Sequence, residues 1–209
     1  MLAASALTCI RGERRIFASL GFTLAAGELL HVLGPNGSGK TSLLRMLCGL
    51  LQPAEGEITW SGEAMRRLGD EYLAQIAYVG HLNGLKDDLT ALENLAVYVG
   101  IEGAADGHDS RDSLARMGLG DCTDFPARWL SQGQRRRLAL SRLLAVPRKL
   151  WILDEPFTGL DKASVTMLQD LLEQHLETGG LVVLTSHQDM RLARNTVREL
   201  HLGPSRREA

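Results

Sequence analysis

Residues 29–44 of the chain read LLHVLGPNGSGKTSLL, and this stretch decides the fold. The apolar run at 29–33 predicts a buried strand, and the apolar residues at helical spacing after Thr41 predict a helix with one apolar face. Between them, residues 34–41 match the pattern G-x-x-x-x-G-K-[ST], which connects a strand to a helix. We therefore expect an α/β sheet with a glycine-rich loop after one of its strands.

The loop has the residues that a phosphate site requires. Glycines allow its backbone to curl so that successive N–H groups converge on an anion, and the helix adds the positive end of its dipole. Lys40 is expected to reach the outer phosphates of a nucleotide, and the Thr41 hydroxyl to bind magnesium. An ordinary glycine-rich turn would not need these two residues in register. The predicted phosphate-binding residues are Gly34, Pro35, Asn36, Gly37, Ser38, Gly39, Lys40, Thr41 and Ser42.

Two later apolar runs end in polar residues that complete such a site. LWILDEP at 150–156 predicts a buried strand that ends in two carboxylates, at the edge of the sheet where α/β proteins bind ligands. Asp154 fits the magnesium carboxylate, which is usually held through a water, and Glu155 can polarise the attacking water and accept its proton. His187 follows the run at 181–185 and is predicted to contact the γ-phosphate, with an ordinary surface histidine as the alternative. The predicted catalytic residues are thus Glu155, His187 and Lys40.

The stretch LSQGQRRR at 130–137 leaves several interpretations open. Ser131 and Gln134 have the spacing of a capping box that begins a helix. Arg135, Arg136 and Arg137 then fall near the first turn, where each exposed cation opposes the helix dipole by about 0.3–1 kcal/mol. That placement suggests an approaching negative charge, which a phosphate, an acidic partner or a nucleic-acid backbone would supply.

The composition narrows the class of protein. The chain has 209 residues, 44% of them hydrophobic, and a formal net charge of -2, whereas a dedicated nucleic-acid binder is usually basic. No apolar run approaches the roughly 20 residues that span a bilayer. The N-terminal residues lack the pattern of a signal peptide, so we expect the chain in the cytoplasm. Its three cysteines are far apart and predict neither a zinc site nor a disulfide framework.

The remaining pattern predicts an α/β fold with an inserted helical part. Short apolar runs in the first 30 residues indicate strands that are antiparallel at first. The predicted helices are 86–100, where Thr90 and Glu93 form a second capping box, then 113–117, 132–146 and 162–177, with a loop at 102–113. We expect an α/β core of residues 1–83 and 146–203, a helical subdomain of residues 84–145, and a disordered tail of residues 204–209.

The ordered motifs GPNGSGKT, LSQGQ, WILDEP, TGLD and TSH resemble the nucleotide-binding subunit of ATP-binding-cassette (ABC) proteins over nearly the whole chain. The resemblance implies a P-loop NTPase fold with a mixed or parallel sheet core, a single domain spanning residues 1–209, and hydrolysis of ATP with Mg²⁺. In that family two subunits face each other and enclose two ATP molecules. By resemblance, Ser131, Gly133 and Gln134 would contact the ATP of the opposite subunit, and Asp161 would bridge the interface.

A narrower resemblance comes from YVGHLNGLKDDLTALENL at 78–95 together with LWILDEPFTGLD. These segments are similar to the ATPase subunits of bacterial cytochrome c maturation, the haem exporter system. The resemblance implies a homodimer on the cytoplasmic face of the inner membrane. It also implies integral membrane subunits of that system as partners, with no nucleic acid expected. The loop at 81–88 would be the part that contacts the membrane partner.

Three positions depart from the usual family pattern. His81 replaces a glutamine that usually contacts magnesium, and Gln132 replaces one residue of the usual Gly-Gly signature pair. Arg11 occupies the place of the aromatic residue that usually stacks on adenine, where a guanidinium can stack as well. The three tryptophans, Trp60, Trp129 and Trp151, are expected to pack rather than to bind. Two alternative functions remain at this point: an ATPase of another ABC transporter, or an ABC ATPase that acts on nucleic acid or ribosomes.

Overall fold

The computed structural model describes residues 1–103, 109–187, 192 and 196–203. The predicted disorder of residues 204–209 falls outside these residues. The strands are β1 (Leu2–Arg11), β2 (Arg14–Leu24), β3 (Glu28–Leu33), β4 (Glu55–Trp60), β5 (Glu63–Ala64), β6 (Ile76–Val79), β7 (Leu150–Asp154), β8 (Leu181–Thr185) and β9 (Thr196–His201). The α-helices are α1 (Lys40–Leu47), α2 (Met65–Leu68), α3 (Asp70–Leu73), α4 (Ala91–Ile101), α5 (Ser110–Arg116), α6 (Gln132–Leu140), α7 (Arg142–Ala145) and α8 (Lys162–Glu177), with short 3-10 helices at Gly120–Cys122 and Ala127–Trp129.

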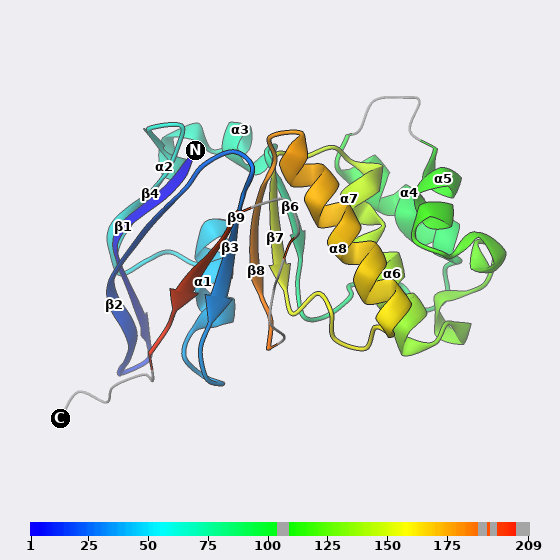
Figure 1. Cartoon of the computed structure of the whole chain (residues 1–209), viewed down its shortest axis with the longest axis horizontal. Coiled ribbons are helices and arrows are strands. Elements are labelled where there is room, and N and C mark those ends of the chain that lie inside the picture. The colour runs from blue at the N-terminus through cyan, green and yellow to red at the C-terminus, as the bar shows by residue number, and fades with distance from the viewer. Residues whose placement is uncertain (104–108, 188–191, 193–195, 204–209) are drawn as a thin grey trace.

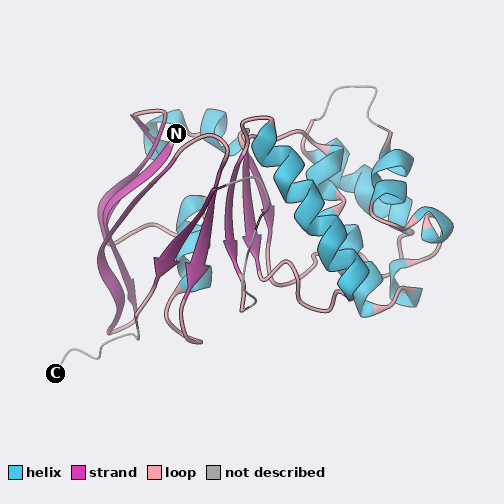
Figure 2. Ribbon diagram, viewed as in Figure 1, coloured by secondary structure: helices cyan, strands magenta, loops and turns pink. Residues whose placement is uncertain are grey.

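The strands form two sheets, as the ribbon in Figure 2 shows. One is an antiparallel sheet in the order β2-β1-β4-β5, and the other is a parallel sheet in the order β6-β7-β8-β3-β9. Helix α1 lies between the two sheets, and α8 covers the opposite face of the parallel sheet, with α4 to α7 beyond it (Figure 1). The prediction of a parallel core with antiparallel N-terminal strands is confirmed.

Strands β7 and β8 of the parallel sheet are apolar on both faces, which explains their continuous apolar runs. Along β7, Leu150 and Ile152 pack into the core around α1, whereas Trp151 and Leu153 pack into the core around α6 and α8. Every residue of β7 and of β8 is buried. A strand covered on both faces has no need for polar alternation. Its first polar residues therefore come at its carboxyl end.

Two capping boxes were predicted, and both form. In each, a hydroxyl accepts a hydrogen bond from the N–H of the third helical residue, and that residue's side chain accepts one from the cap: Thr90 with Glu93, and Ser131 with Gln134. The box at Thr90 begins the helix at Ala91, so the predicted start at residue 86 is wrong. Residues 162–177 are helical as predicted.

Other predictions are corrected. The helix predicted at 132–146 divides into α6 and α7 at Ser141, whose hydroxyl donates a hydrogen bond to the Leu138 carbonyl and so competes with the helix backbone. The helix predicted at 113–117 begins earlier, because Asp109 caps it at Ser110. Trp129 does not pack in the core: it is 67% exposed, whereas Trp151 is buried. Strand β6 and the short helices α2 and α3 were not predicted. Among the described helices, none has the length and apolar content to cross a bilayer.

Candidate functional site

The glycine-rich loop lies between β3 and α1, where a strand of the antiparallel sheet presses against it. Gly39 is the N-cap of α1 with a φ of 99°. A Cβ there would lie 2.5 Å from Ile16 Cγ2 and 3.0 Å from Phe17 Cδ1, so only glycine fits. Lys40 is the first residue of the helix, and its Nζ donates a hydrogen bond to the Gly34 carbonyl at 2.8 Å. Its ammonium group therefore lies within the loop, beside the free N–H groups of α1.

Two hydroxyl groups hold the carboxylate at the end of β7. The Thr41 hydroxyl donates to Asp154 Oδ2 at 2.9 Å, and the Thr185 hydroxyl donates to Asp154 Oδ1 at 2.8 Å. Hydroxyl and carboxylate oxygens are the hard donors that Mg²⁺ prefers. Thr41 and Asp154, which lie side by side here, therefore fit a magnesium site in which Thr41 would bind the ion directly and Asp154 through a water.

Glu155 has an unusual backbone and an unusual side chain. Its φ of 50° is in the left-handed region, which costs a non-glycine residue about 1 kcal/mol or more. Its N–H donates to Thr185 Oγ1 at 2.8 Å, which holds the residue in this conformation. Its Oε1 is buried, accepts no hydrogen bond from the described protein atoms, and lies 3.4 Å from His187 Nε2. A buried carboxylate oxygen with free acceptor capacity is suited to take a proton from water.

These groups line one cavity of about 580 Å³. It receives residues from the loop, from α1, and from the carboxyl ends of β7 and β8. Two residues that were not predicted, Ile16 and Thr158, line it as well. The predicted site residues in its lining are Arg11, Pro35, Asn36, Gly37, Gly39, Lys40, Thr41, Ser42, His81, Asp154, Glu155 and His187.

Arg11 and Ile16 bound this cavity at the side of the antiparallel sheet, on β1 and β2. Arg11 is exposed, and no described aromatic side chain lines the cavity with it. A guanidinium beside an aliphatic side chain presents a flat and an apolar surface to a base. Arg11 is thus at the place where the sequence predicts base stacking.

Ser131, Gly133, Gln134 and Asp161 do not line this cavity. Ser131 is exposed at the start of α6, and a Cβ on Gly133 would lie 3.0 Å from the Gly159 carbonyl oxygen. The Gln134 side chain is occupied by the capping box and by Cys122 Sγ, which accepts its amide hydrogen at 3.2 Å. Asp161 caps α8, and hydrogen bonds from Ser164 lower its pKa. If these residues contact a nucleotide, it would be one bound in the cavity of a second copy of the chain.

The three arginines of LSQGQRRR donate hydrogen bonds to protein groups, so their place near the helix start needs no approaching phosphate or nucleic acid. Arg135 donates to the Ala127 carbonyl and pairs with Asp87 at 2.6 Å. Arg137 donates to the carbonyls of residues 117 and 118. Arg136 is buried and donates to carbonyls beside Glu155. Capping and these tertiary contacts account for the motif without a nucleic-acid backbone.

Comparison with known proteins decides the family. The family model described as ABC transporter matches residues 17–158. The chain belongs to the ABC transporter family. It is 53% identical over 197 residues to the cytochrome c biogenesis ATP-binding export protein CcmA of Nitrosospira multiformis (94% of this chain, 96% of that protein) and 52% identical over 203 residues to CcmA of Nitrosomonas europaea (97% and 95%). The fold matches the ATP-binding cassette MJ0796 in a dimeric post-hydrolysis state bound to ADP and Pi, with a TM-score of 0.83, 26% identity, and coverage of 100% of this chain and 98% of that one.

The comparisons confirm the resemblance to ABC proteins and the narrower resemblance to the ATPase subunits of cytochrome c maturation. The chain is an ABC ATPase that binds ATP and hydrolyses it. ABC ATPases of this kind work in pairs on membrane partners. The alternative of a nucleic-acid or ribosome ATPase is not favoured.

Proposed function

We propose that this ABC ATPase binds ATP with Mg²⁺ in the cavity beside the glycine-rich loop and hydrolyses it with Glu155 as the general base. One observation carries the catalytic assignment. Glu155 Oε1 is buried in the cavity lining without a hydrogen bond from the described protein, opposite His187 and next to Asp154. A water at this oxygen would lose its proton as it attacks the terminal phosphate.

Each neighbouring residue has a defined part in the proposal. The loop N–H groups and the end of α1 bind the phosphates, and Lys40 moves its ammonium from the Gly34 carbonyl to their oxygens. Thr41 and Asp154 would hold magnesium, which would neutralise charge on the phosphates. His187 donates to the γ-phosphate and keeps Glu155 oriented. His81 lines the same cavity, and Arg11 would stack on the base.

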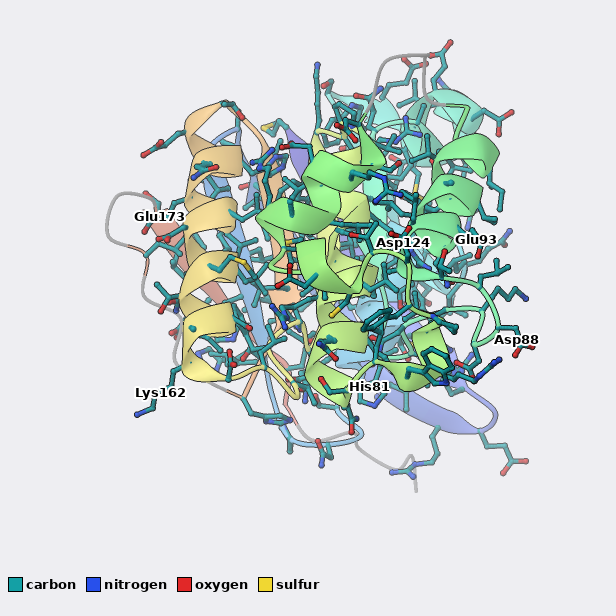
Figure 3. All side chains as sticks on the ribbon, turned by 90° about the vertical axis from the view of Figure 1, so that its right-hand side faces the viewer. His81, Asp88, Glu93, Asp124, Lys162 and Glu173 are labelled. Atoms are coloured by element: carbon teal, nitrogen blue, oxygen red, sulfur yellow. The ribbon has the colours of Figure 1, made fainter. Side chains whose placement is uncertain are left out.

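The signature residues are placed to serve the ATP site of a second copy of the chain. Ser131 is exposed at the N-terminus of α6 and lies outside its own cavity. We propose that Ser131, Gly133 and Gln134 contact the ATP bound by the opposite subunit, and that Asp161 lies at the interface between the two. In this arrangement residues 84–145 form a helical subdomain that carries the signature, and residues 1–83 with 146–203 form the core that carries the cavity. The helical side faces the viewer in Figure 3.

The same side offers a surface for the membrane partner. The segment 81–90 is held against residues 125–129, since the Ala127 N–H donates to the Leu89 carbonyl at 2.8 Å and Arg128 pairs with Asp88. Large apolar side chains stay exposed on these two segments: Leu82 is 84% exposed, Trp129 67% and Phe125 48%. His81, Asp88 and Asp124 mark this surface in Figure 3. Exposed aromatic residues with charged neighbours are typical of protein interfaces.

We propose that this partner is an integral membrane subunit of c-type cytochrome biogenesis, at the cytoplasmic face of the bacterial inner membrane. Relatives at about 50% identity are named cytochrome c biogenesis ATP-binding export proteins, and these names support a role in that process. The work done is either export of haem or release of haem from a membrane-bound chaperone.

Purification from detergent-solubilised membranes tests this function. A tagged chain is expected to recover a haem-handling membrane protein, and Trp129→Ser is expected to reduce that recovery. Leu50→Ser is the matched control, because Leu50 is equally exposed, at 67%, but lies after α1. Recovery of ribosomes without a membrane protein would contradict the proposal, as would equal recovery with both variants.

A further inference from the structure

Arg136 is a buried cation that the hydrolysis chemistry does not use directly. It lies in α6, two residues after Gln134 and only 3% exposed. Its guanidinium makes five hydrogen bonds. The Nε donates to the Pro156 carbonyl at 3.2 Å, one terminal nitrogen donates to the Gly80 carbonyl at 2.8 Å and to Asn83 Oδ1 at 3.1 Å, and the other donates to the carbonyls of Asp154 at 2.9 Å and Glu155 at 3.0 Å.

These five acceptors belong to two segments. One segment contains His81, and the other contains Glu155. Gly80 and Asn83 flank His81, which lines the cavity, while residues 154–156 are the end of β7 from which the hydrolytic carboxylate projects. Arg136 itself belongs to the helix that begins with the signature. One planar guanidinium therefore joins the signature helix, the His81 loop and the Glu155 backbone, and its fork geometry fixes their relative positions.

The acceptors of Arg136 are neutral carbonyl and amide oxygens, and no carboxylate hydrogen-bonds to its guanidinium in the described chain. Burial lowers its pKa, and the nearby charges of Asp154 and Glu155 oppose that shift. A buried cation with only neutral acceptors is costly compared with an apolar residue of similar volume. Packing alone therefore does not explain an arginine at this position.

We propose that Arg136 is a positioning residue that couples the signature helix of one subunit to that subunit's own hydrolytic carboxylate. This inference rests on the proposed function, because it needs Glu155 as the base and the signature at the ATP of the opposite subunit. ATP that binds against Ser131 fixes the position of the start of α6 relative to the opposite subunit. Arg136 transmits this change directly to the backbone of residues 154–156, whose carbonyls accept its hydrogen bonds at 2.9–3.2 Å. ATP in one site then sets the position of the base in the other, and the two sites hydrolyse cooperatively.

The neighbouring arginine provides a matched control. Arg137 has the same charge and adjoins Arg136, but it bonds to the carbonyls of Met117 and Gly118 in the helical part of the chain. It makes no hydrogen bond to residues 80–83 or 154–156 in the described structure. Loss of Arg137 removes two hydrogen bonds on α6 without touching the cavity wall.

Steady-state hydrolysis by the complete ATPase, with ATP binding measured separately, tests the coupling. Arg136→Gln is expected to leave ATP affinity within about threefold and to lower kcat about 10- to 100-fold, the effect of a misplaced catalytic group. The Hill coefficient for ATP is expected to fall towards 1. Arg136→Lys is not expected to restore kcat, since one ammonium cannot reproduce the fork. Arg137→Gln should keep kcat within about twofold and keep the Hill coefficient of the original protein.

Asn83→Leu keeps the test decisive if Arg136→Gln does not fold. It removes one of the five hydrogen bonds from a half-buried loop residue, and the expected change has the same direction with a smaller size. An unchanged kcat and Hill coefficient in Arg136→Gln, or in Asn83→Leu where the former does not fold, would overturn the coupling. The variant Glu155→Gln separates the two proposals. If it hydrolyses ATP normally, the base is wrongly assigned. If it is inactive and Arg136→Gln stays cooperative, only the coupling fails.

Discussion

Thr185 offers the sharpest test of how the end of β7 is held. It is fully buried at the end of β8, opposite Asp154 in the sheet register. Its hydroxyl donates to Asp154 Oδ1 and accepts from the Glu155 N–H, both at 2.8 Å. Thr185→Val keeps the side-chain shape and removes both hydrogen bonds. The substitution leaves the Asp154 Oδ1 acceptor and the Glu155 N–H donor without their partner.

The expected cost follows from these two bonds. A hydrogen bond to a carboxylate contributes about 1.5–3 kcal/mol, and a buried N–H left unpaired costs about 1–3 kcal/mol. Partial relaxation reduces the sum, so we expect Thr185→Val to lower the free energy of unfolding by about 3 kcal/mol. For a chain of this length that corresponds to a fall in Tm of about 6–12 °C. Hydrolysis is expected to fall as well, since the Glu155 backbone loses the bond that holds its left-handed conformation.

The assay is equilibrium unfolding in urea at pH 7, with Thr185→Ser as the control. Serine keeps the hydroxyl and loses one buried methyl group, which costs about 1 kcal/mol. Valine should therefore be the more destabilising of the two. If Thr185→Ser lowers the free energy of unfolding more than Thr185→Val does, side-chain shape rather than hydrogen bonding holds the end of β7, and the reasoning is refuted.

Two further predictions concern His175 and Arg11. His175 stacks on Trp151 with ring centroids 3.7 Å apart, and burial lowers its pKa to about 4. Because the unfolded chain binds this proton near pH 6.5, stability falls as the pH drops from about 6.5 to 4, by up to about 3 kcal/mol. His175→Phe should lack this loss in unfolding measurements at pH 7 and pH 4.5, and an identical fall in both proteins would contradict the assignment. Arg11→Ala should raise KM for ATP about 3- to 10-fold at constant kcat, whereas Arg11→Phe should keep it; a change confined to kcat would show that Arg11 does not contact the base.

Much of the fold and the cavity could be predicted because their signals are local. The loop at 34–42 needs glycines, a lysine and a threonine at fixed spacing, and the capping boxes at Thr90 and Ser131 are complete within four residues. The apolar runs at 150–154 and 181–185 reveal strands covered on both faces. The residues predicted beside the phosphates, from Pro35 to Ser42, line the cavity almost without exception.

The rest depends on contacts between distant segments. Four apolar residues at 76–79 are too short a run to identify β6, which forms because it pairs with β7. The role of Thr185 depends on its register with Asp154, and that of Arg136 on acceptors about 20 and 55 residues away. Trp129 has a large apolar side chain of the kind usually found in a core, yet in its short 3-10 helix this side chain is exposed to solvent. No local pattern distinguishes these cases.

The central claim is that Glu155 is the hydrolytic base of this ABC ATPase. The most direct measurement is ATP turnover of Glu155→Gln, together with the mass of the protein in ATP and Mg²⁺ by size-exclusion chromatography with light scattering. We predict that ATP binding persists, that turnover falls by about 100-fold or more, and that the variant accumulates as an ATP-bound dimer. Turnover at the rate of the original protein, with no dimer retained, would contradict the account.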